Sequence, residues 1–363
     1  MPFNPTEFLI DEELSKNHVF ESMGRRIEGL QRGSEIIEKL RQPFAESLRQ
    51  RVERSAEAGE ALAQLRHQIE ESGKRLEAFS NGKMTRAELV QAGRPGWLEA
   101  LGPKAKEVFK RVYDDVGTRP PLIPDEALAA LFGQKELRGD WSARHTGNDF
   151  TFYEPIPDVG VRRDALGDPE PPPMSPPSID RCFTATFDKQ ETISSAQMLT
   201  FPIAISTPAS RRFFTDCQSI GTAFPSWGWA RATVGTDIVV PPGFTTLQVT
   251  ADIDFSGSFA SGALFATGAV ASGDLIVKLT HSNGSSAETL SSVGVQVAAV
   301  LSWGTTAASG NRIVSCVMNV PSTGGVARLL AGAQSVSTAA VGVSLWAVSS
   351  LSGTVRSICV VAT

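Results

Sequence analysis

Two carboxylates offer the best chance of catalysis in this sequence. Asp252 and Asp254 are two positions apart in a stretch with strand-like alternation, so both side chains would lie on one face of a strand. Glycoside hydrolysis needs two carboxyl groups about 5 to 10 Å apart. No other residue marks this pair as catalytic, and His18, His67, His145 and His281 are isolated in the sequence. We therefore expect a structural or binding protein and not an enzyme.

The four cysteines do not form a metal-binding pattern. Cys182, Cys217, Cys316 and Cys359 are far apart, without a C-x-x-C pair or a histidine at ligand spacing. This disfavours zinc. Without a secretion signal, the spacing predicts four reduced and buried thiols in preference to disulfides. We expect no metal and no cofactor.

Tryptophan side chains are the candidate ligand contacts, because an indole ring can pack on a sugar ring. Trp303 and Trp346 lie at the ends of predicted strands and are expected in the core. Trp227 and Trp229 follow Phe224-Pro225-Ser226 in a predicted loop. They are the better candidates for a surface site.

Charge divides the 363-residue chain into unlike halves. From Asp180 onward basic and acidic residues balance, so the net charge of −5 belongs to the first half. Neither half has the clustered Lys and Arg that nucleic acid binding needs. No apolar run approaches the roughly 20 residues that span a bilayer, and residues 1–7 do not resemble a signal peptide. We expect neither nucleic acid binding nor membrane insertion.

Composition and periodicity predict four segments. Residues 1–33, interrupted by Gly24, Gly29 and Gly33, read as an irregular or locally helical N-terminal arm. Residues 34–153 read as a helical anchor domain containing a long helix over 43–80, with Pro43 in its first turn or at a kink. The proline-rich residues 154–179 predict an extended linker, and residues 180–363 a β domain.

The long helix carries a heptad-like apolar stripe. Leu62, Leu65, Ile69 and Leu76 fit the spacing of a coiled-coil seam. The stripe is explained either by an oligomeric coiled coil or by packing on later helices of the same chain. Because so long a helix needs a partner along its length, an oligomeric contact is slightly favoured.

Beyond the linker the apolar period changes to two, which predicts an antiparallel β-sandwich or jelly roll. About ten short strands are expected. They are separated by turns that include Ser256-Gly257, Ser272-Gly273-Asp274, Asn283-Gly284 and Ser309-Gly310-Asn311.

The predicted sandwich is poor in charge. Stretches 293–300 and 339–345 carry small or apolar residues at successive positions, so both faces of the strands are uncharged. Soluble monomers usually carry charge on outer faces and edges. We therefore expect contacts between subunits there, for example at Ala298 and Val343. The alternative is one larger sandwich that buries both faces internally.

The stretch from Asp237 to Ala251 is similar to the V-x-V-P-x-G-x-T-x-x-x-V-T-A strand-turn-strand of the trimeric jelly-roll heads of phage tail fibres. The layout of helical anchor, proline linker and Ser/Gly/Ala/Thr-rich β domain also resembles phage or gene-transfer-agent virion proteins of the fibre, spike or collar type. This resemblance implies a virion component, assembled in the bacterial cytoplasm.

The main hypothesis is a homotrimeric virion protein whose helical part docks to other virion proteins. Its β domain would project, for decoration or for attachment to a host-surface glycan. A carbohydrate-binding adhesin that uses Trp227 and Trp229 is the alternative, and a glycan-degrading spike is less favoured.

Overall fold

The structure is a computed structural model that describes about three quarters of the chain. The described residues are 10, 12–80, 82–85, 88, 107–108, 111–112, 124–132, 142–146, 149–153 and 179–363, the last range with gaps at 186, 198–199, 222–225, 264–267, 299–301 and 340–344. The linker predicted over 154–179 lies outside the described residues, apart from its last position.

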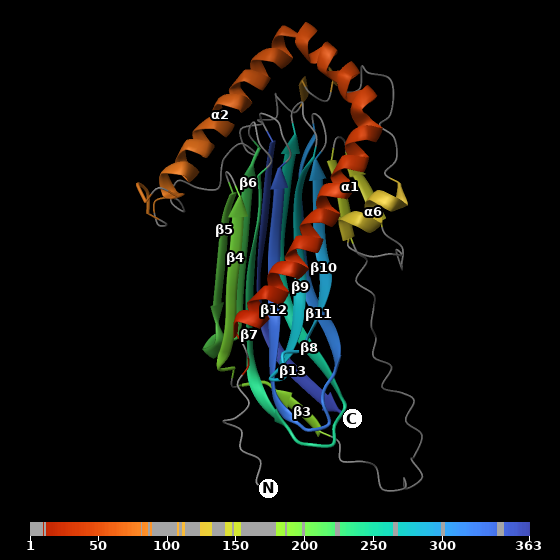
Figure 1. Cartoon of the computed structure of the whole chain (residues 1–363). Coiled ribbons are helices and arrows are strands. Elements are labelled where there is room, and N and C mark those ends of the chain that lie inside the picture. Colours follow the sequence, from red (N-terminus) through yellow and green to blue (C-terminus); the bar gives the residue numbers. More distant parts are fainter. Residues whose placement is uncertain are drawn as a thin grey trace.

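Most described residues belong to two antiparallel sheets packed face to face (Figure 1). The first sheet has the strand order β1-β2-β10-β9-β12-β7-β4, and the second has the order β11-β8-β13-β6-β5 with β3 paired to β13. The predicted antiparallel sandwich is therefore confirmed. The strands are β1 (Ser142–Thr146), β2 (Asp149–Tyr153), β3 (Ile179–Phe183), β4 (Lys189–Gln197), β5 (Thr200–Thr207), β6 (Arg212–Ile220), β7 (Ser226–Val240), β8 (Thr246–Ala263), β9 (Ala269–His281), β10 (Ser286–Ala298), β11 (Ser302–Asn319), β12 (Gly325–Ala339) and β13 (Leu345–Ala362), and a short 3-10 helix spans Pro208–Ser210.

Several strands are longer than the sequence predicts, because some glycines taken as turns lie inside strands. Gly257 and Gly273 surround the fully buried ring of Phe259, as does Gly294. A Cβ at Gly273 would come within 2.4 Å of that ring, and one at Gly294 within 2.5 Å. These glycines thus admit a large aromatic side chain between the sheets. The turn at Asn283-Gly284 is confirmed, with Gly284 at φ +88°.

The N-terminal segment, expected to be irregular or locally helical, is a regular helix from Glu12 onward. Helix α1 (Glu12–Arg54) runs through Pro43, and α2 (Ala56–Ser80) follows it at an angle. The helix predicted over 43–80 is thus divided at Ser55, whose Oγ accepts a hydrogen bond from the Ala58 N–H at 3.2 Å and so caps α2. None of the described helices combines the length and apolar character that crossing a bilayer needs.

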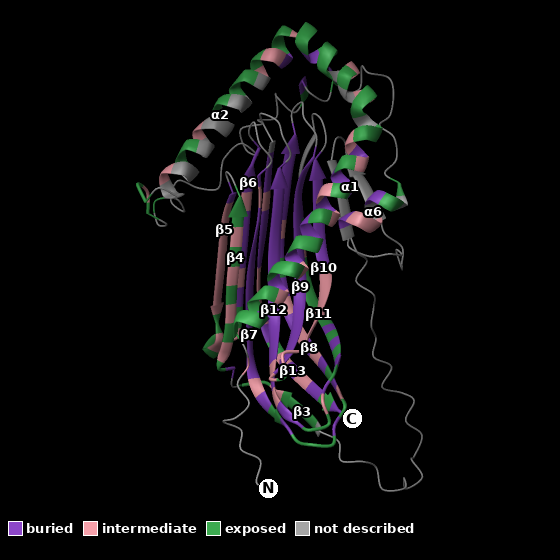
Figure 2. Ribbon diagram, in the orientation of Figure 1, coloured by how far each residue is buried: buried purple, intermediate pink, exposed green. Residues whose placement is uncertain are grey.

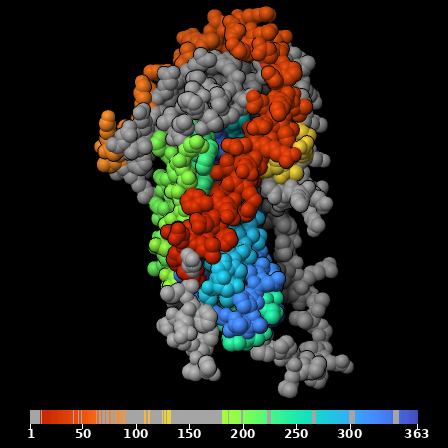
Figure 3. All heavy atoms as spheres, in the orientation of Figure 1, coloured from red at the N-terminus to blue at the C-terminus, as the bar shows by residue number. Residues whose placement is uncertain are grey.

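Helix α1 lies diagonally across the outer face of the first sheet (Figures 1 and 3). Its buried positions recur every three or four residues, which gives one continuous stripe. The apolar members pack on residues of β7, β9, β10 and β12 and form a second core outside the sandwich. This stripe comprises Ser15, Val19, Met23, Arg26, Ile27, Leu30, Gly33, Ser34 and Ile37.

Two glycines that appeared to interrupt α1 are the sites where a second helix contacts it. Helix α6 (Asp125–Phe132) packs across Gly29 and Gly33. A Cβ at Gly29 would lie 2.8 Å from the Ala130 carbonyl oxygen, and one at Gly33 would lie 2.6 Å from the Leu131 side chain. The missing side chains therefore permit close packing of the helices.

The charge-poor strands are buried mainly by the chain itself. Every residue of β9 is buried, because the second sheet covers one face and α1 covers the other (Figure 2). Ala298 is fully buried in the core between the sheets, so the prediction that it contacts another subunit is wrong. The alternative, in which both faces are buried internally, holds for this part of the sandwich. Val343 lies outside the described residues.

Two further segments differ from the predicted organisation. Strands β1 and β2, expected at the edge of a helical domain, join the first sheet through pairing of β2 with β10. Cys182 and Cys359, opposite each other on β3 and β13, form a disulfide, so the expectation of four reduced thiols is wrong for this pair. Cys217 and Cys316 are free and buried.

Candidate functional site

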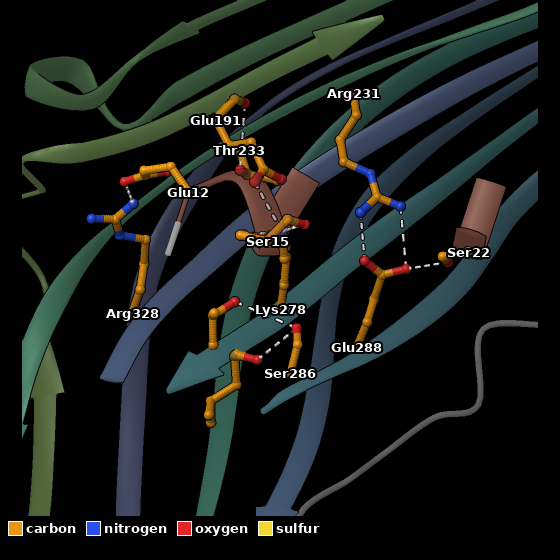
Figure 4. A network of polar contacts seen from close by, with 12 residues as sticks. Glu12, Ser15, Ser22, Glu191, Arg231, Thr233, Lys278, Ser286, Glu288 and Arg328 are labelled. Atoms are coloured by element: carbon orange, nitrogen blue, oxygen red, sulfur yellow. Dashed lines mark hydrogen bonds and ion pairs between the residues drawn. The ribbon is translucent and has the colours of Figure 1, made fainter. Parts of the chain in front are cut away.

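Four cationic side chains of the sandwich and of α1 form an ionic interface beneath the helix. Figure 4 shows three of them, Arg231, Lys278 and Arg328. Each cation is paired with a carboxylate, and each cluster includes a contact with α1. We call this set the helix–sheet interface. It consists of Glu12, Ser15, Ser22 and Arg26 on α1, and of Glu191, Arg231, Asp237, Asp274, Lys278, Glu288, Arg328 and Gln334 on the sheet.

The most deeply buried pair joins α1 to β9. The side chains of Arg26 and Asp274 are only 5% and 2% exposed. Arg26 donates from Nε and Nη2 to the two carboxylate oxygens, at 3.3 and 3.2 Å. Its remaining donors reach the Ser272 Oγ at 2.7 Å and the Leu131 carbonyl oxygen. The same guanidinium thus binds the sheet and holds α6.

A second buried pair joins β7 to β10. Arg231 is fully buried, forms an ion pair with Glu288 and donates to the Gln334 Oε1 at 2.7 Å. Ser22 on α1 donates to the Glu288 Oε1 at 2.6 Å. Burial opposes ionisation of Glu288, but the charge and hydrogen bonds of Arg231 together with Ser22 outweigh it and lower the pKa of Glu288. Glu288 is therefore a carboxylate at neutral pH.

Lys278 on β9 provides the third cation. Its Nζ donates to the Glu191 Oε2 and to the Ser15 Oγ, both at 2.8 Å. Burial lowers the pKa of Lys278, and Glu191 opposes that change. Ser15, on the first turn of the buried α1 stripe, thus contributes to a site made mainly by β4 and β9.

The fourth cluster lies at the start of α1. Arg328 on β12 binds Asp237 with two donors, Nε at 2.8 Å and Nη2 at 3.2 Å. Its Nη1 forms an ion pair with Glu12 in the first turn of α1. The hydrogen bond with Asp237 raises the pKa of Arg328. Because Glu12 is largely exposed, this cluster is the most accessible to solvent of the four.

This arrangement holds α1 in one place on the sheet. Most of its donors and acceptors bind one another, and the exceptions include the buried Glu191 Oε1 and Arg231 Nε. Neither of two described cavities, of about 590 and 420 Å³, is lined by a residue of the interface. Among the residues that the structure describes, no group of three or more metal-binding side chains could hold a metal ion.

The predicted ligand contacts do not form an exposed pair. Trp229 is 1% exposed and lies in the core beneath α1, where its ring meets Phe20 edge-on with centroids 5.4 Å apart. Trp227 is half-buried and packs against the same core. Trp346 is fully buried, as expected. The surface role proposed for Trp229 is therefore wrong, and Trp227 lacks its partner.

The two carboxylates do lie on the same face of β8, but as hydrogen-bond acceptors. The Asn311 Nδ2 donates to both Asp252 and Asp254, and Arg356 forms an ion pair with Asp254. Desolvation opposes ionisation of Asp254, but Arg356 and Asn311 outweigh it and lower its pKa. A general acid for glycoside hydrolysis needs a raised pKa. This pair thus stabilises neighbouring strands.

A second surface lies on the opposite side of the sandwich, on the outer face of β8, β11 and β13. Ile313, Val317 and Val361 are 49%, 57% and 37% exposed there. Val317 and Val361 both lie opposite Gln248, on either side of β8, and Ser315 and Thr250 share a hydroxyl hydrogen bond at 2.9 Å. We call these six residues the β8–β11–β13 face. These six side chains are uncharged and partly aliphatic, and Asp252, which lies opposite Ile313, and the Asp254–Arg356 pair border them on the same outer face.

Sequence reasoning missed the helix–sheet interface because polar residues interrupt the apolar pattern of α1. Ser15, Arg26 and Ser34 occupy buried positions of the α1 stripe, so an apolar pattern alone does not reveal it. The available signal was in the strands. Arg231 and Lys278 are isolated charges in a nearly charge-free domain, and such charges need a fixed partner when buried.

The heptad positions of α2 are not brought to any described contact. Leu62, Leu65, Ile69 and Leu76 lie within α2, but their side chains are outside the described set. The coiled-coil seam and its alternative both stay predictions.

Comparisons with known proteins give no family. No protein-family model and no curated protein matches the chain. Weakly similar solved structures include a xylan-binding domain from CBM 22 (11% identity, 45% of this chain and 86% of that chain, TM-score 0.17). They also include the bacteriophage CBA120 tailspike protein 4 (9% identity, 46% and 19%, TM-score 0.17) and the infectious bursal disease virus Gx strain (14% identity, 59% and 42%, TM-score 0.18). Scores this low carry no argument about function.

Proposed function

We propose that this protein is a structural, non-enzymatic component of a phage-like virion, of the fibre, spike, collar or decoration type. The sandwich with α1 forms one body, and this body contacts other subunits. The observation that carries the proposal is the contrast between the two outer faces of the sandwich. One is covered by α1 through the helix–sheet interface, whereas the β8–β11–β13 face leaves Ile313, Val317 and Val361 exposed.

Exposed aliphatic side chains gathered on one face are typical of protein–protein contacts. The stretch from Asp237 to Ala251, which resembles a fibre-head sequence, ends in β8 on the sheet that bears this face. Both features favour assembly into a particle over enzymatic turnover.

The structure changes which part of the helical region is available for docking. Because α1 is bound to the sheet from Glu12 to Ile37, it belongs to the β body. We propose that α2, which leaves α1 at Ser55, reaches other virion proteins through its stripe of Leu62, Leu65, Ile69 and Leu76. Contact with a host-surface glycan is a finer part of this proposal, which does not include the homotrimer expected from the sequence.

The test is the composition of purified particles. Particles banded from a producing strain should contain this chain at a fixed copy number by quantitative mass spectrometry. Val361→Asp should lower that number, because it places a charge in the β8–β11–β13 face. Val239→Asp is the matched control, since Val239 is 48% exposed on β7 of the other sheet. Recovery of the chain only in the particle-free fraction would reject the proposal.

A further inference from the structure

The second sheet ends in a long, regular edge strand. β11 pairs with β8 through successive residues from Ser302 to Asn319, without a shift in register. In the described sheet no strand lies beyond β11. A strand in this position presents backbone N–H and C=O groups that can pair with another chain.

The other sheet edges carry features that discourage such pairing. β5 contains Pro202, which lacks a backbone N–H. β4 begins with Lys189, a charged residue that lies near Asp188 and Asp237. β1 has only five residues. Natural proteins protect edges with proline, charge or short length. β11 contains no proline and is long, and its one charged residue, Arg312, points inward to β10.

The exposed side chains of β11 are uncharged. Along its second half, buried and exposed positions alternate, and the exposed ones include Ile313, Ser315 and Val317. The charged residue of this strand is Arg312. It donates to the Ser291 Oγ at 2.8 Å and to the Ser292 carbonyl oxygen at 2.6 Å, so it binds β10 across the sandwich. The edge therefore offers aliphatic and hydroxyl groups to a partner.

The outward-facing residues of this edge, from Asn311 to Asn319, match one another in type when the strand is reversed about Ser315. In an antiparallel pair centred there, Ser315 faces its own copy and Ile313 faces Val317 of the other chain. The next outward pair is Asn311 with Asn319. Each exposed aliphatic group thus meets another one, and each polar group meets a polar group, which is the pattern that stabilises cross-strand pairs.

We infer that β11 pairs antiparallel with β11 of a second copy of this chain, about a two-fold axis at Ser315. The pairing extends the second sheet across both subunits and covers Ile313 and Val317. A two-fold contact uses the same patch on both partners, and the self-matching edge meets this requirement. The inference deepens the proposed function, on which it rests for the expectation that copies assemble.

Disulfide trapping tests the register directly. In full-length Ser315→Cys, the two new thiols face each other across the axis, within the Cα separation of about 4.4 to 6.8 Å that a disulfide needs. Mild oxidation should give a covalent dimer on a non-reducing gel. Ser309→Cys is the matched control, because the two copies of residue 309 would be about 40 Å apart at 3.3 to 3.4 Å per residue. Equal trapping of both variants, or none of Ser315→Cys, would overturn the inference.

Light scattering of the wild type should give twice 38.7 kDa, the mass of a dimer. Val317→Lys should give 38.7 kDa at the same concentration with unchanged thermal stability, whereas Val239→Lys should stay dimeric. A wild-type monomer at tens of micromolar would overturn the inference, as would a trimer without trapping at Ser315→Cys. If either outcome is found while the chain is still present in particles, the pairing of β11 is rejected and the proposed function is retained. A trapped dimer that is absent from particles rejects the function alone.

Discussion

Replacing Asp274 with asparagine tests whether the helix–sheet interface fixes α1. The substitution keeps the shape of the side chain and removes its charge. Arg26 then stays only 5% exposed, with Ser272 and the Leu131 carbonyl oxygen as its remaining partners. Gln334, which donates to Asp274 at 2.9 Å, competes for the single oxygen that asparagine retains.

The expected cost is about 3 to 5 kcal/mol of unfolding free energy, the range found when one partner of a buried ion pair is removed. Most of this cost comes from leaving the Arg26 guanidinium buried without a counter-ion, and less of it comes from losing the attraction between Arg26 and Asp274. The double variant Arg26→Met/Asp274→Leu should therefore recover most of the loss, because well-packed apolar residues often replace a buried pair without penalty.

Urea denaturation with two probes measures this effect. Far-ultraviolet circular dichroism at about 222 nm follows mainly the helices, α1 among them. Tryptophan emission includes Trp229, which packs against Phe20 of α1. Glu126→Gln is the matched control, because the Arg32–Glu126 pair also joins α1 to another element but is 65 to 68% exposed. It should cost at most about 1 kcal/mol. A loss below about 1 kcal/mol in Asp274→Asn would refute the view that this pair fixes the helix.

Three further predictions concern the core, the disulfide and the pH dependence. Gly294→Ala should cost about 1 to 3 kcal/mol in urea denaturation, because its Cβ would lie 2.5 Å from the Phe259 ring, and Phe259→Leu should relieve part of that cost. Cys182→Ser should lower unfolding free energy by about 2 to 4 kcal/mol, since the bond to Cys359 closes a separation of 177 residues, and the wild type under reducing conditions should match it. Glu288 has a folded-state pKa below its ordinary 4.5, so its stabilising effect is present above pH 4.5 and is lost as pH falls through the folded pKa. The melting temperature of the wild type should fall over that range, and Glu288→Gln should show a smaller dependence.

The sheet architecture could be predicted from the sequence because it depends on local alternation. The strand boundaries could not be predicted as well, because Gly257 and Gly273 look like turn residues. In the structure both lie inside strands and leave room for the Phe259 ring. The packing of α1 was also out of reach. Ser22 and Glu288 lie 266 residues apart, and Glu12 and Arg328 lie 316 apart, so no local pattern links them.

The charge-poor composition of the β half has two separate physical causes. An apolar outer strand can be covered by its own chain or by another copy, and composition alone does not distinguish them. The isolated charges do. Arg231 and Lys278 are buried, and burial of a charge is costly unless its partners are permanently fixed, as Glu288 and Glu191 are here. A helix of the same chain meets that requirement.

The exposed side of the β11 edge has no charge that needs a fixed partner. Its exposed side chains carry no charge that a partner must neutralise, so the edge remains soluble through Ser315 and its neighbours when it is alone. Pairing there adds backbone hydrogen bonds and covers Ile313 and Val317 without desolvating an ion. The helix–sheet interface therefore suits a permanent contact within one chain. The β11 edge suits a contact that forms between folded subunits. Assembly of a particle from folded copies requires such contacts.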